Sequence, residues 1–501
     1  MMTQSNTVLC DPRKAAASSP AWRVWKTVVP LNLVSAPIVV ASLVIYAAVG
    51  SVVSYSPMWV VTFSVGIPVV LLAGFRRTRY LALVAVFGIA PFMPYVKAIT
   101  GVRYGPLALD IALMVVVVAV VLDSALEHRC LRWSRPDSGV VLFMAIGIVQ
   151  VFNPLGPGVL QALEGYRILV WQMVGFLLGR RLVQSPGDVR TVVTVLRIVA
   201  TLVAIYAVKQ YFLPSDLDGR MIELSSGDSV TYTALDSGRA FSTMSSPFHL
   251  SFLMTIMIIL NVSVLELSRH KIAWIAQTLL FGVALLVAIV RTGWIGLVVG
   301  LVSLWLLKAV EKRRVVGSVG QLVLIGATLV LVSQPLLAYY PDSAITQRVA
   351  SLTALTEESS YTGRVNSWPD VILPAIAANP FGYGVGSDNT TRNARFYSHN
   401  GFFYIAIEMG VPALLLVLLI LAGAIRSSFR TCLTMRDPML RSIGLWVLAC
   451  WASIMVMGTF GAFIEVYPVS LYLWFFLGLI TVLPEIENEH GATNEQDTNP
   501  T

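Results

Sequence analysis

The sequence predicts an all-α protein, a polytopic bundle of about 12 to 14 transmembrane helices with a large, partly helical loop outside the membrane. Three observations predict it. Of the 501 residues, 56% are hydrophobic and 12% are charged, whereas about a quarter of the residues of soluble domains are charged. Apolar stretches of roughly 20 residues, the length that crosses a bilayer, recur along the chain. Clusters of Lys and Arg stand between them at every second loop.

About 14 apolar stretches have a length near that of a membrane span, and the shortness of several lowers the expected number to about 12. The membrane domain is therefore expected to run from residue 31 to residue 484, after a polar and basic segment, residues 1–30. The stretches cover residues 36–53, 58–75, 80–96, 105–122, 138–152, 168–179, 191–212, 247–267, 272–290, 292–307, 318–336, 400–421, 442–459 and 464–483.

The basic loops predict the orientation, because Lys and Arg accumulate on the cytoplasmic side of membrane proteins. Examples are "FRRTR", "EHRCLRWSR", "KAVEKRR" and "IRSSFRTCLTMRD". Both termini are then cytoplasmic, and the chain is expected in the cytoplasmic membrane. Topology and contact with anionic membrane lipids explain the net charge of +8, so no nucleic acid partner is expected.

Two loops of appreciable length face outward in this topology, residues 213–246 and residues 335–398. The longer one contains two segments with amphipathic helical spacing, residues 343–355 and 361–380, the second with Thr362 as N-cap and Pro380 at its end. A glycine-rich turn, "NPFGYGVGSDN", follows. Residues 485–501 have little apolar surface to bury and are expected to form a disordered cytoplasmic tail.

Ionisable side chains near the bilayer are costly, so those on the outer half are candidate functional residues. His399 and Asn400 stand where the long loop enters a span. A neutral imidazole there can accept a proton from a hydroxyl group. The alternative is that His399 caps the helix or lies among the lipid headgroups.

Several arginines share this outer half. Arg239 lies just before a span and Arg291 lies within a tight apolar hairpin, "AIVRTGWIGL". A guanidinium in such a place usually pairs with a carboxylate or phosphate, and its forked donors fit a pyrophosphate. Arg364 falls on the first turn of a loop helix. The alternatives are an exposed loop cation for Arg239 and snorkelling to the membrane surface for Arg291.

Weaker candidates accompany these residues. Arg392 and Arg395 lie close to His399, where attraction to headgroups is the favoured reading, although several cations there describe a basin for an anion. The N–H groups of "GYGVG", which includes Gly384 and Gly386, could cradle a phosphate, but we read this segment first as a turn. Glu408 is too far along its helix to touch His399. Paired His and CxxC motifs are missing, so neither a metal site nor a cofactor is expected, with oxygen-ligand sites left open.

The segment "SHNGFFYIAIEMGVPALLL", in which a His-Asn pair opens a span and Glu-x-Gly follows two to three turns later, resembles the C-terminal signature of the O-antigen ligase and Wzy-type polymerase superfamily. "TGRVNSWPDVILPAIAANPFGYGVGS" looks like the outer-loop run of that family, and "RAFSTMSSPFHLSFLM" and "IVRTGWIGLVVGLV" are similar to its two earlier arginine segments. The resemblance extends over roughly residues 160–420. Val290 departs from the pattern, since the family often has a small hydroxyl residue there.

The resemblance implies a membrane glycosyltransferase with an extracytoplasmic site, which uses a polyprenyl-diphosphate-linked glycan as donor without a metal. His399 would be the general base on the hydroxyl of a glycan or lipid-glycan acceptor, with inversion at the anomeric carbon. Arg239 and Arg291 would bind the diphosphate, and Arg364 would be a further donor contact. The remaining supporting residues would be Asn400, Gly384, Gly386 and Glu408. The residues do not choose between a ligase and a polymerase.

Two alternatives of other classes stay open. One is a transporter, such as a flippase for lipid-linked glycan precursors. Its polar groups would be expected near the middle of the membrane, whereas here they concentrate at the outer edge. The other is a non-catalytic partner of polysaccharide-assembly proteins, with the long loop as the docking surface.

Overall fold

The computed structural model describes residues 87–100, 113, 116–117, 135–225, 238–311, 366–388, 400–459, 461 and 469–497. The chain divides into two compact units, Met1–Ala90 with Thr100–Arg135, and Pro91–Ile99 with Pro136–Thr501. Nearly all the described residues belong to the second unit, and the packing below is that unit's own. All regular secondary structure in the described ranges is helical, which confirms the all-α prediction.

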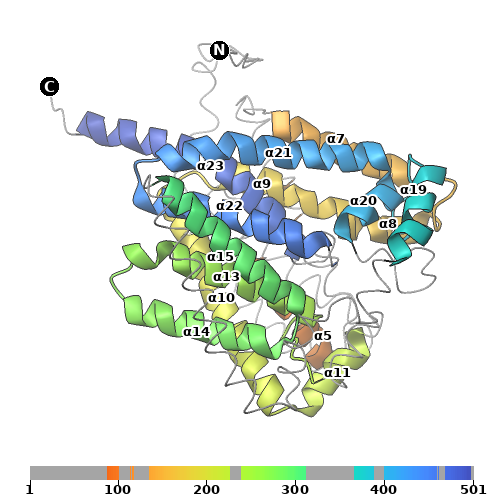
Figure 1. The fold of residues 1–501 in the computed structure, drawn as a ribbon, viewed down its shortest axis with the longest axis horizontal. Helices are drawn as coiled ribbons and strands as arrows, with labels where there is room; N and C mark the ends of the chain where they lie inside the picture. Colours follow the sequence, from red (N-terminus) through yellow and green to blue (C-terminus); the bar gives the residue numbers. More distant parts are fainter. Residues whose placement is uncertain are drawn as a thin grey trace, which may run out of the picture. The chain divides into compact units, whose positions relative to one another are not determined.

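The helices are named in chain order in Figure 1, where η marks 3-10 and π turns. They are η5 (Ala90–Phe92), α5 (Met93–Thr100), α7 (Arg135–Val151), α8 (Val159–Gly165), η6 (Tyr166–Val170), η7 (Trp171–Met173), α9 (Val174–Leu182), α10 (Pro186–Phe212), α11 (Asp216–Ser225), α13 (Pro247–Val264), η8 (Leu265–Leu267), α14 (Lys271–Val287), α15 (Arg291–Glu311), η10 (Trp368–Ile372), α19 (Leu373–Ala378), α20 (Gly401–Met409), α21 (Val411–Thr434), α22 (Pro438–Thr459) and α23 (Val469–Asp497).

Six helices of the described part are long and apolar enough to cross a membrane: α10, α13 with η8, α15, α21, α22 and the first three-quarters of α23. They confirm a polytopic membrane helical protein. The spans expected at residues 36–53, 58–75 and 318–336 lie outside the described residues. The span at 105–122 lies mostly outside and the span at 80–96 is described only from residue 87, so the total of 12 to 14 stays a prediction. The helix expected at residues 343–355 also lies outside the described residues and stays a prediction.

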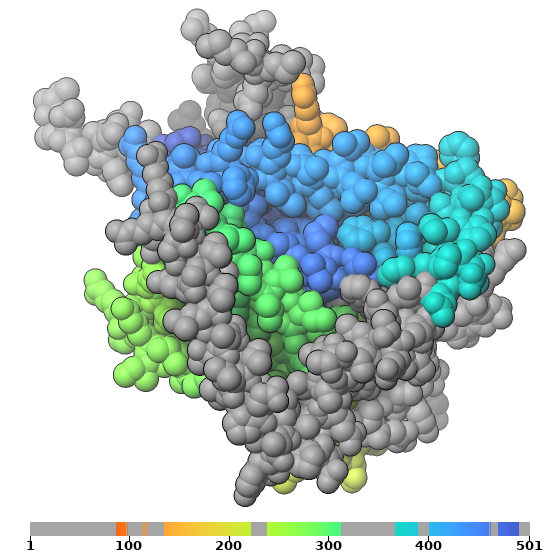
Figure 2. Space-filling view, in the orientation of Figure 1, coloured from red at the N-terminus to blue at the C-terminus, as the bar shows by residue number. Residues whose placement is uncertain are grey.

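Helix α21 forms part of the molecular surface, in blue in Figure 2. It exposes Leu415, Leu418 and Leu419 to 54%, 39% and 70%. A soluble protein would bury such a stripe, whereas a bilayer supplies an apolar solvent for it. The exposed leucines therefore agree with a lipid-facing helix.

Helices α13 and α15 pack closely as a parallel pair. A side chain on Gly293 would overlap the hydroxyl of Ser251, and one on Gly300 would overlap Ile259, so contacts advance in the same direction along both helices. Glycines allow such close approach of membrane helices. The consequence for function is that the N-terminal turns of α13 and α15 lie level with each other.

The expected span at residues 400–421 is wrong as a single helix. Helix α20 ends at Met409, and α21 begins at Val411 and continues to Thr434, through residues 425–434 that were expected in a cytoplasmic loop. The break falls at Gly410, whose φ of 89° is readily adopted only by glycine. Pro412 in the first turn of α21 reinforces a new helix start.

The span expected at residues 168–179 is also irregular, because a π turn (η6) and a 3-10 turn (η7) precede α9. The buried Gln172 side chain donates to the carbonyl of Arg167 at 3.1 Å. An internal side chain thus satisfies a backbone acceptor where the regular ladder is disturbed.

The disordered tail expected at residues 485–501 is contradicted as far as Asp497, where α23 ends. The reason is a contact that sequence periodicity cannot show. The Glu487 carboxylate accepts the backbone N–H groups of Arg436 and Asp437, both at 2.6 Å. Asp437 in turn caps α22 by accepting from the backbone of Met439 and Leu440. The start of the tail is therefore tied to the turn between α21 and α22.

Candidate functional site

Arg239 and Arg291 lie on segments that are hydrogen-bonded to each other. The backbone N–H of Ala240 donates to the carbonyl of Val287 at 3.0 Å. Arg239 directly precedes Ala240, and Arg291 opens α15 just after the turn that follows Val287. Both arginines are partly exposed. The fold therefore brings two of the predicted diphosphate-binding residues into one neighbourhood.

Backbone strain marks the same two segments. Within the described ranges, two residues other than glycine have positive φ: Ser242 at 61° and Ile289 at 52°. A positive φ is costly for any side chain with a Cβ, and most so for a β-branched one such as isoleucine. Such strain persists where the surrounding structure imposes it, often at binding sites. Here it occurs three residues after Arg239 and two residues before Arg291.

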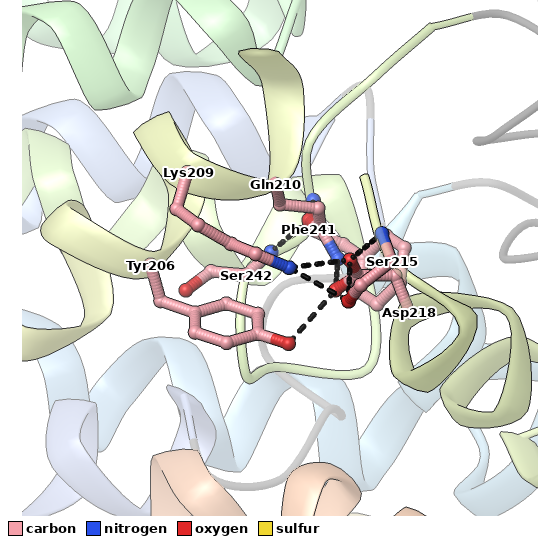
Figure 3. Close-up of polar contacts among 7 residues, drawn as sticks. All are labelled: Tyr206, Lys209, Gln210, Ser215, Asp218, Phe241 and Ser242. Atoms are coloured by element: carbon pink, nitrogen blue, oxygen red, sulfur yellow. Dashed lines mark hydrogen bonds and ion pairs between the residues drawn. The ribbon is translucent and has the colours of Figure 1, made fainter. Parts of the chain in front are cut away.

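The conformation of Ser242 is held by helix α10. The side-chain oxygen of Gln210 accepts from the backbone N–H groups of Phe241 and Ser242, at 2.8 and 2.7 Å. The Ser242 hydroxyl donates to the carbonyl of Val203 at 2.6 Å. Gln210 and Ser242 are buried. These contacts, of which Figure 3 draws those of Gln210, fix the chain that follows Arg239.

Asp218 of α11 is the centre of the same cluster (Figure 3). Its carboxylate accepts from the amide of Gln210 at 3.0 Å and from the side chains of Tyr206, Lys209 and Ser215 at 2.8, 3.0 and 2.8 Å. Burial alone would raise the pKa of Asp218, but the hydrogen bonds from Lys209, Ser215 and Tyr206 outweigh it and lower the pKa below its usual value. Asp218 is therefore ionised at neutral pH.

The level N-termini of α13 and α15 add positive electrostatic potential beside the arginines. Ser246 caps α13, its hydroxyl accepting from the backbone N–H of Phe248 at 3.2 Å. The first N–H groups and the dipoles of two parallel helices both favour an anion at this end. His249, in the first turn of α13, is buried with Nδ1 at 2.9 Å from the hydroxyl of Ser245, in keeping with a structural role.

Three hydroxyl groups near these helix ends are buried without a hydrogen-bond partner in the part of the chain that the structure describes. They belong to Thr243, Ser251 and Thr292. A buried hydroxyl without a partner is unfavourable by about 1–3 kcal/mol, so such groups commonly meet water or a ligand. Thr292 directly follows Arg291, whereas the family's small hydroxyl residue would precede the arginine, at Val290.

Of the predicted residues, His399, Arg364, Arg392 and Arg395 lie outside the described residues, as does the expected N-cap Thr362. Asn400 is described and buried. Its side-chain oxygen accepts from the backbone N–H groups of Phe402 and Phe403, at 2.9 and 3.2 Å. The N-cap of α20 is therefore Asn400.

The glycine-rich turn is filled by protein atoms. Gly382, Gly384 and Gly386 have φ of 89°, 93° and 82°. The N–H groups of Tyr383 and Gly384 donate to the carbonyls of Ile407 and Glu408, at 2.8 and 3.0 Å. Those bonds tie the turn to the end of α20, far along the chain.

The carboxylate of Glu408 occupies the remaining concave part of this turn. Glu408 is fully buried and accepts from the backbone N–H of Asp388 at 3.2 Å and from that of Gly386. Successive N–H groups form anion-binding concavities, and here the anion is a side chain of the protein itself. The geometry favours the turn interpretation over a phosphate cradle for Gly384 and Gly386.

Gln210 and Asp218 were missed by the sequence reasoning. The available signal was a polar pair, Lys209-Gln210, at the end of an apolar span, followed within ten residues by Asp216 and Asp218. Among the described residues, no group of three or more His, Cys, Asp or Glu side chains is placed to hold a metal ion.

The fold defines an integral membrane protein in which two arginines lie beside the N-terminal ends of two parallel helices. Residues 276–418 match the family model described as O-antigen ligase. This match agrees with the resemblance that the sequence motifs predicted, and it supports, in general terms, a glycan transferase of the O-antigen ligase or polymerase type. The matched segment includes Arg291, His399 and Glu408 but not Arg239. No curated protein matches the chain.

Proposed function

We propose that this protein transfers a glycan from a polyprenyl-diphosphate-linked donor to an acceptor hydroxyl, on the outer face of the cytoplasmic membrane, during assembly of a surface or exported polysaccharide. The observation that carries the proposal is the joined pair of segments bearing Arg239 and Arg291, beside the level N-termini of α13 and α15. The match of residues 276–418 to the O-antigen ligase model supports the reaction class.

In the proposed reaction the acceptor oxygen attacks the anomeric carbon while the bond from that carbon to the diphosphate oxygen breaks. The polyprenyl diphosphate leaves with the electron pair of that bond, and the acceptor proton passes to His399. Attack opposite the leaving group inverts the anomeric configuration. A diphosphate is already a good leaving group, so the protein needs chiefly one proton acceptor and stabilisation of the departing charge.

Arg239 and Arg291 would supply that stabilisation. A guanidinium presents planar, paired donors that match phosphate oxygens, and its interaction strengthens as charge accumulates on the leaving diphosphate. Two arginines and two helix N-termini together provide an electrophilic environment without a metal ion. Arg364 is proposed as a third contact to the donor on the strength of the family resemblance.

The location also suits a lipid-linked donor. Such a donor keeps its polyprenyl chain in the bilayer, so its diphosphate lies at headgroup level. The arginine segments stand at the ends of helices long enough to cross a membrane. A site built there can reach the diphosphate without removing the lipid tail from the membrane.

The proposal is tested by transfer with purified protein in detergent, supplied with a polyprenyl-diphosphate oligosaccharide, acceptor glycans and EDTA. Wild type is compared with His399→Ala and with His270→Ala, a control at an exposed histidine at the start of α14. Wild type and the control should form product, as a ladder if the protein is a polymerase or as a single addition if it is a ligase. Full activity of His399→Ala would overturn the assignment of the base.

A further inference from the structure

Gln210 connects three parts of the molecule through one side chain. It lies near the end of α10 and is 3% exposed. Its oxygen accepts from the N–H groups of Phe241 and Ser242, and its nitrogen donates to Asp218 of α11 (Figure 3). Buried amides are unfavourable unless their hydrogen bonds are made, so this side chain has one satisfactory arrangement.

Asp218 sets the direction in which the Gln210 amide points. An ionised carboxylate only accepts hydrogen bonds, and a backbone N–H only donates them. The amide nitrogen must therefore face Asp218, and the amide oxygen must face Phe241 and Ser242. In the opposite orientation the amide oxygen would face the Asp218 carboxylate, and the amide NH2 group would face the N–H groups of Phe241 and Ser242.

The Gln210 oxygen stabilises a strained turn. Two consecutive N–H groups donate to it, and the second belongs to Ser242, which has a left-handed φ of 61°. That conformation costs about 1–2 kcal/mol for a residue with a Cβ. Without an acceptor at this point, the turn would lose the contact that offsets its strain and would relax toward an ordinary backbone conformation.

The strained residue Ser242 belongs to the second of two anchors that follow Arg239 in the chain. In the first anchor Ala240 is hydrogen-bonded to Val287 at the end of α14, and in the second Phe241 and Ser242 are bonded to α10. Relaxation at Ser242 therefore moves the backbone next to Arg239 relative to the start of α15. The position of Arg239 with respect to Arg291 depends on Gln210.

We propose that Gln210, oriented by Asp218, is a positioning residue that holds Arg239 in the geometry needed to bind the diphosphate of the donor. This inference rests on the proposed function. Gln210 itself does not touch the reacting atoms and acts through Arg239. Because it governs binding of the diphosphate, its loss should weaken the donor interaction more than it slows transfer at saturating donor.

The test exchanges donor and acceptor in the hydrogen bond between the side chains at positions 210 and 218. Gln210→Glu keeps an oxygen for Phe241 and Ser242 but opposes a carboxylate to Asp218. Asp218→Asn keeps one oxygen for Lys209 and Ser215 but turns a nitrogen toward the Gln210 amide. In the double variant Gln210→Glu with Asp218→Asn, the introduced amide donates to the introduced carboxylate, so the bond between positions 210 and 218 is restored with its direction reversed. The Tyr206 hydroxyl, which donates to the same Asp218 oxygen in wild type, would then accept from the introduced amide. Gln184→Glu, at an exposed position before α10, is the matched control.

The measurement is the donor KM and the kcat of transfer for each protein, with thermal unfolding alongside. Gln210→Glu should raise the donor KM by about tenfold or more, the equivalent of one buried hydrogen bond to a charged group, with kcat much less affected. The double variant should return the KM to within about threefold of wild type. An unchanged KM in Gln210→Glu, or a double variant impaired as much as the single one, would overturn the inference.

A second probe separates this inference from the proposed function. Binding of inorganic pyrophosphate to the same purified variants is followed by calorimetry. If wild type transfers no glycan, the proposed function is wrong, and the binding series still decides the inference. Weaker binding in Gln210→Glu with recovery in the double variant supports it, whereas equal binding in all variants refutes it.

Discussion

Ala240 donates its backbone N–H to the carbonyl of Val287 at 3.0 Å, immediately beside Arg239 and just ahead of Arg291. Positions almost 50 residues apart in sequence are joined by one hydrogen bond. Each side of that bond carries a strained residue, Ser242 or Ile289. The arginine pair is thus built on backbone that its surroundings hold in place.

Replacing either arginine should weaken donor binding. Arg239→Gln or Arg291→Gln removes charge-assisted hydrogen bonds to the diphosphate and should lower kcat/KM by about 10- to 100-fold. Arg291→Lys should recover part of the loss, because it keeps the charge but not the paired donors. The steady-state kinetics of transfer measure this, with Arg269→Gln, an exposed residue between η8 and α14, as control. Activity of the Arg291→Gln variant equal to that of the control would exclude Arg291 from the site.

His399 should control the chemical step. His399→Ala removes the proposed base and should lower kcat by about 10² to 10⁴, while the donor KM changes little because His399 does not contact the diphosphate. Membrane extraction and thermal unfolding of the variant should match those of wild type. A large rise in donor KM without loss of kcat would instead assign His399 to binding.

The glycine turn should be sensitive to a single methyl group. In Gly382→Ala the new Cβ would come within 2.7 Å of the carbonyl oxygen of Glu408 at a φ of 89°, so the turn and α20 must separate. The expected loss is about 2 kcal/mol or more, seen as a lower unfolding temperature. Gly423→Ala, in α21 with open space around the new methyl group, should be neutral or slightly stabilising. Equal unfolding temperatures for the two variants would refute the packing of the turn.

Asp218 should make stability depend on pH in the acid range. Its pKa in the folded protein lies below its usual value of 3.8, because hydrogen bonds from Lys209, Ser215 and Tyr206 outweigh the effect of burial. The resulting stability is fully present above that usual value and is lost as the pH falls through the folded pKa. Thermal unfolding between about pH 3 and pH 7 should therefore decline at the acid end. Asp218→Asn should flatten the decline, and Asp216→Asn, at an exposed position of the same helix, should retain it.

Much of the fold could be predicted because hydropathy and basic loops are local properties of the sequence. The break at Gly410 was missed although "GVP" is a helix-breaking pattern, since an apolar window runs straight across it. The helical tail was missed because Glu487 is held by backbone groups some 50 residues away. Both failures concern contacts that are distant in sequence.

The candidate site could also be predicted only in part. The residue types and positions of Arg239 and Arg291 marked them as unusual, because a guanidinium at a membrane edge is costly. Their joining through Ala240 and Val287 depends on how α10, α13, α14 and α15 pack, and no periodicity encodes it. Gln210 could not be identified from the sequence for the same reason, because its partners Asp218 and Ser242 come from separate segments of the chain between α10 and α13.

The two glycan-lipid hypotheses, transferase and flippase, differ in the fate of one bond. A transferase breaks the bond between the sugar and the diphosphate, whereas a flippase moves the donor intact across the bilayer. The most direct measurement is mass spectrometry of polyprenyl diphosphate and glycan products after purified wild-type protein, in proteoliposomes with EDTA, meets the donor and an acceptor. We predict polyprenyl diphosphate released in equal amount to the glycan transferred. Intact donor redistributed between leaflets, with no diphosphate released, would contradict the account.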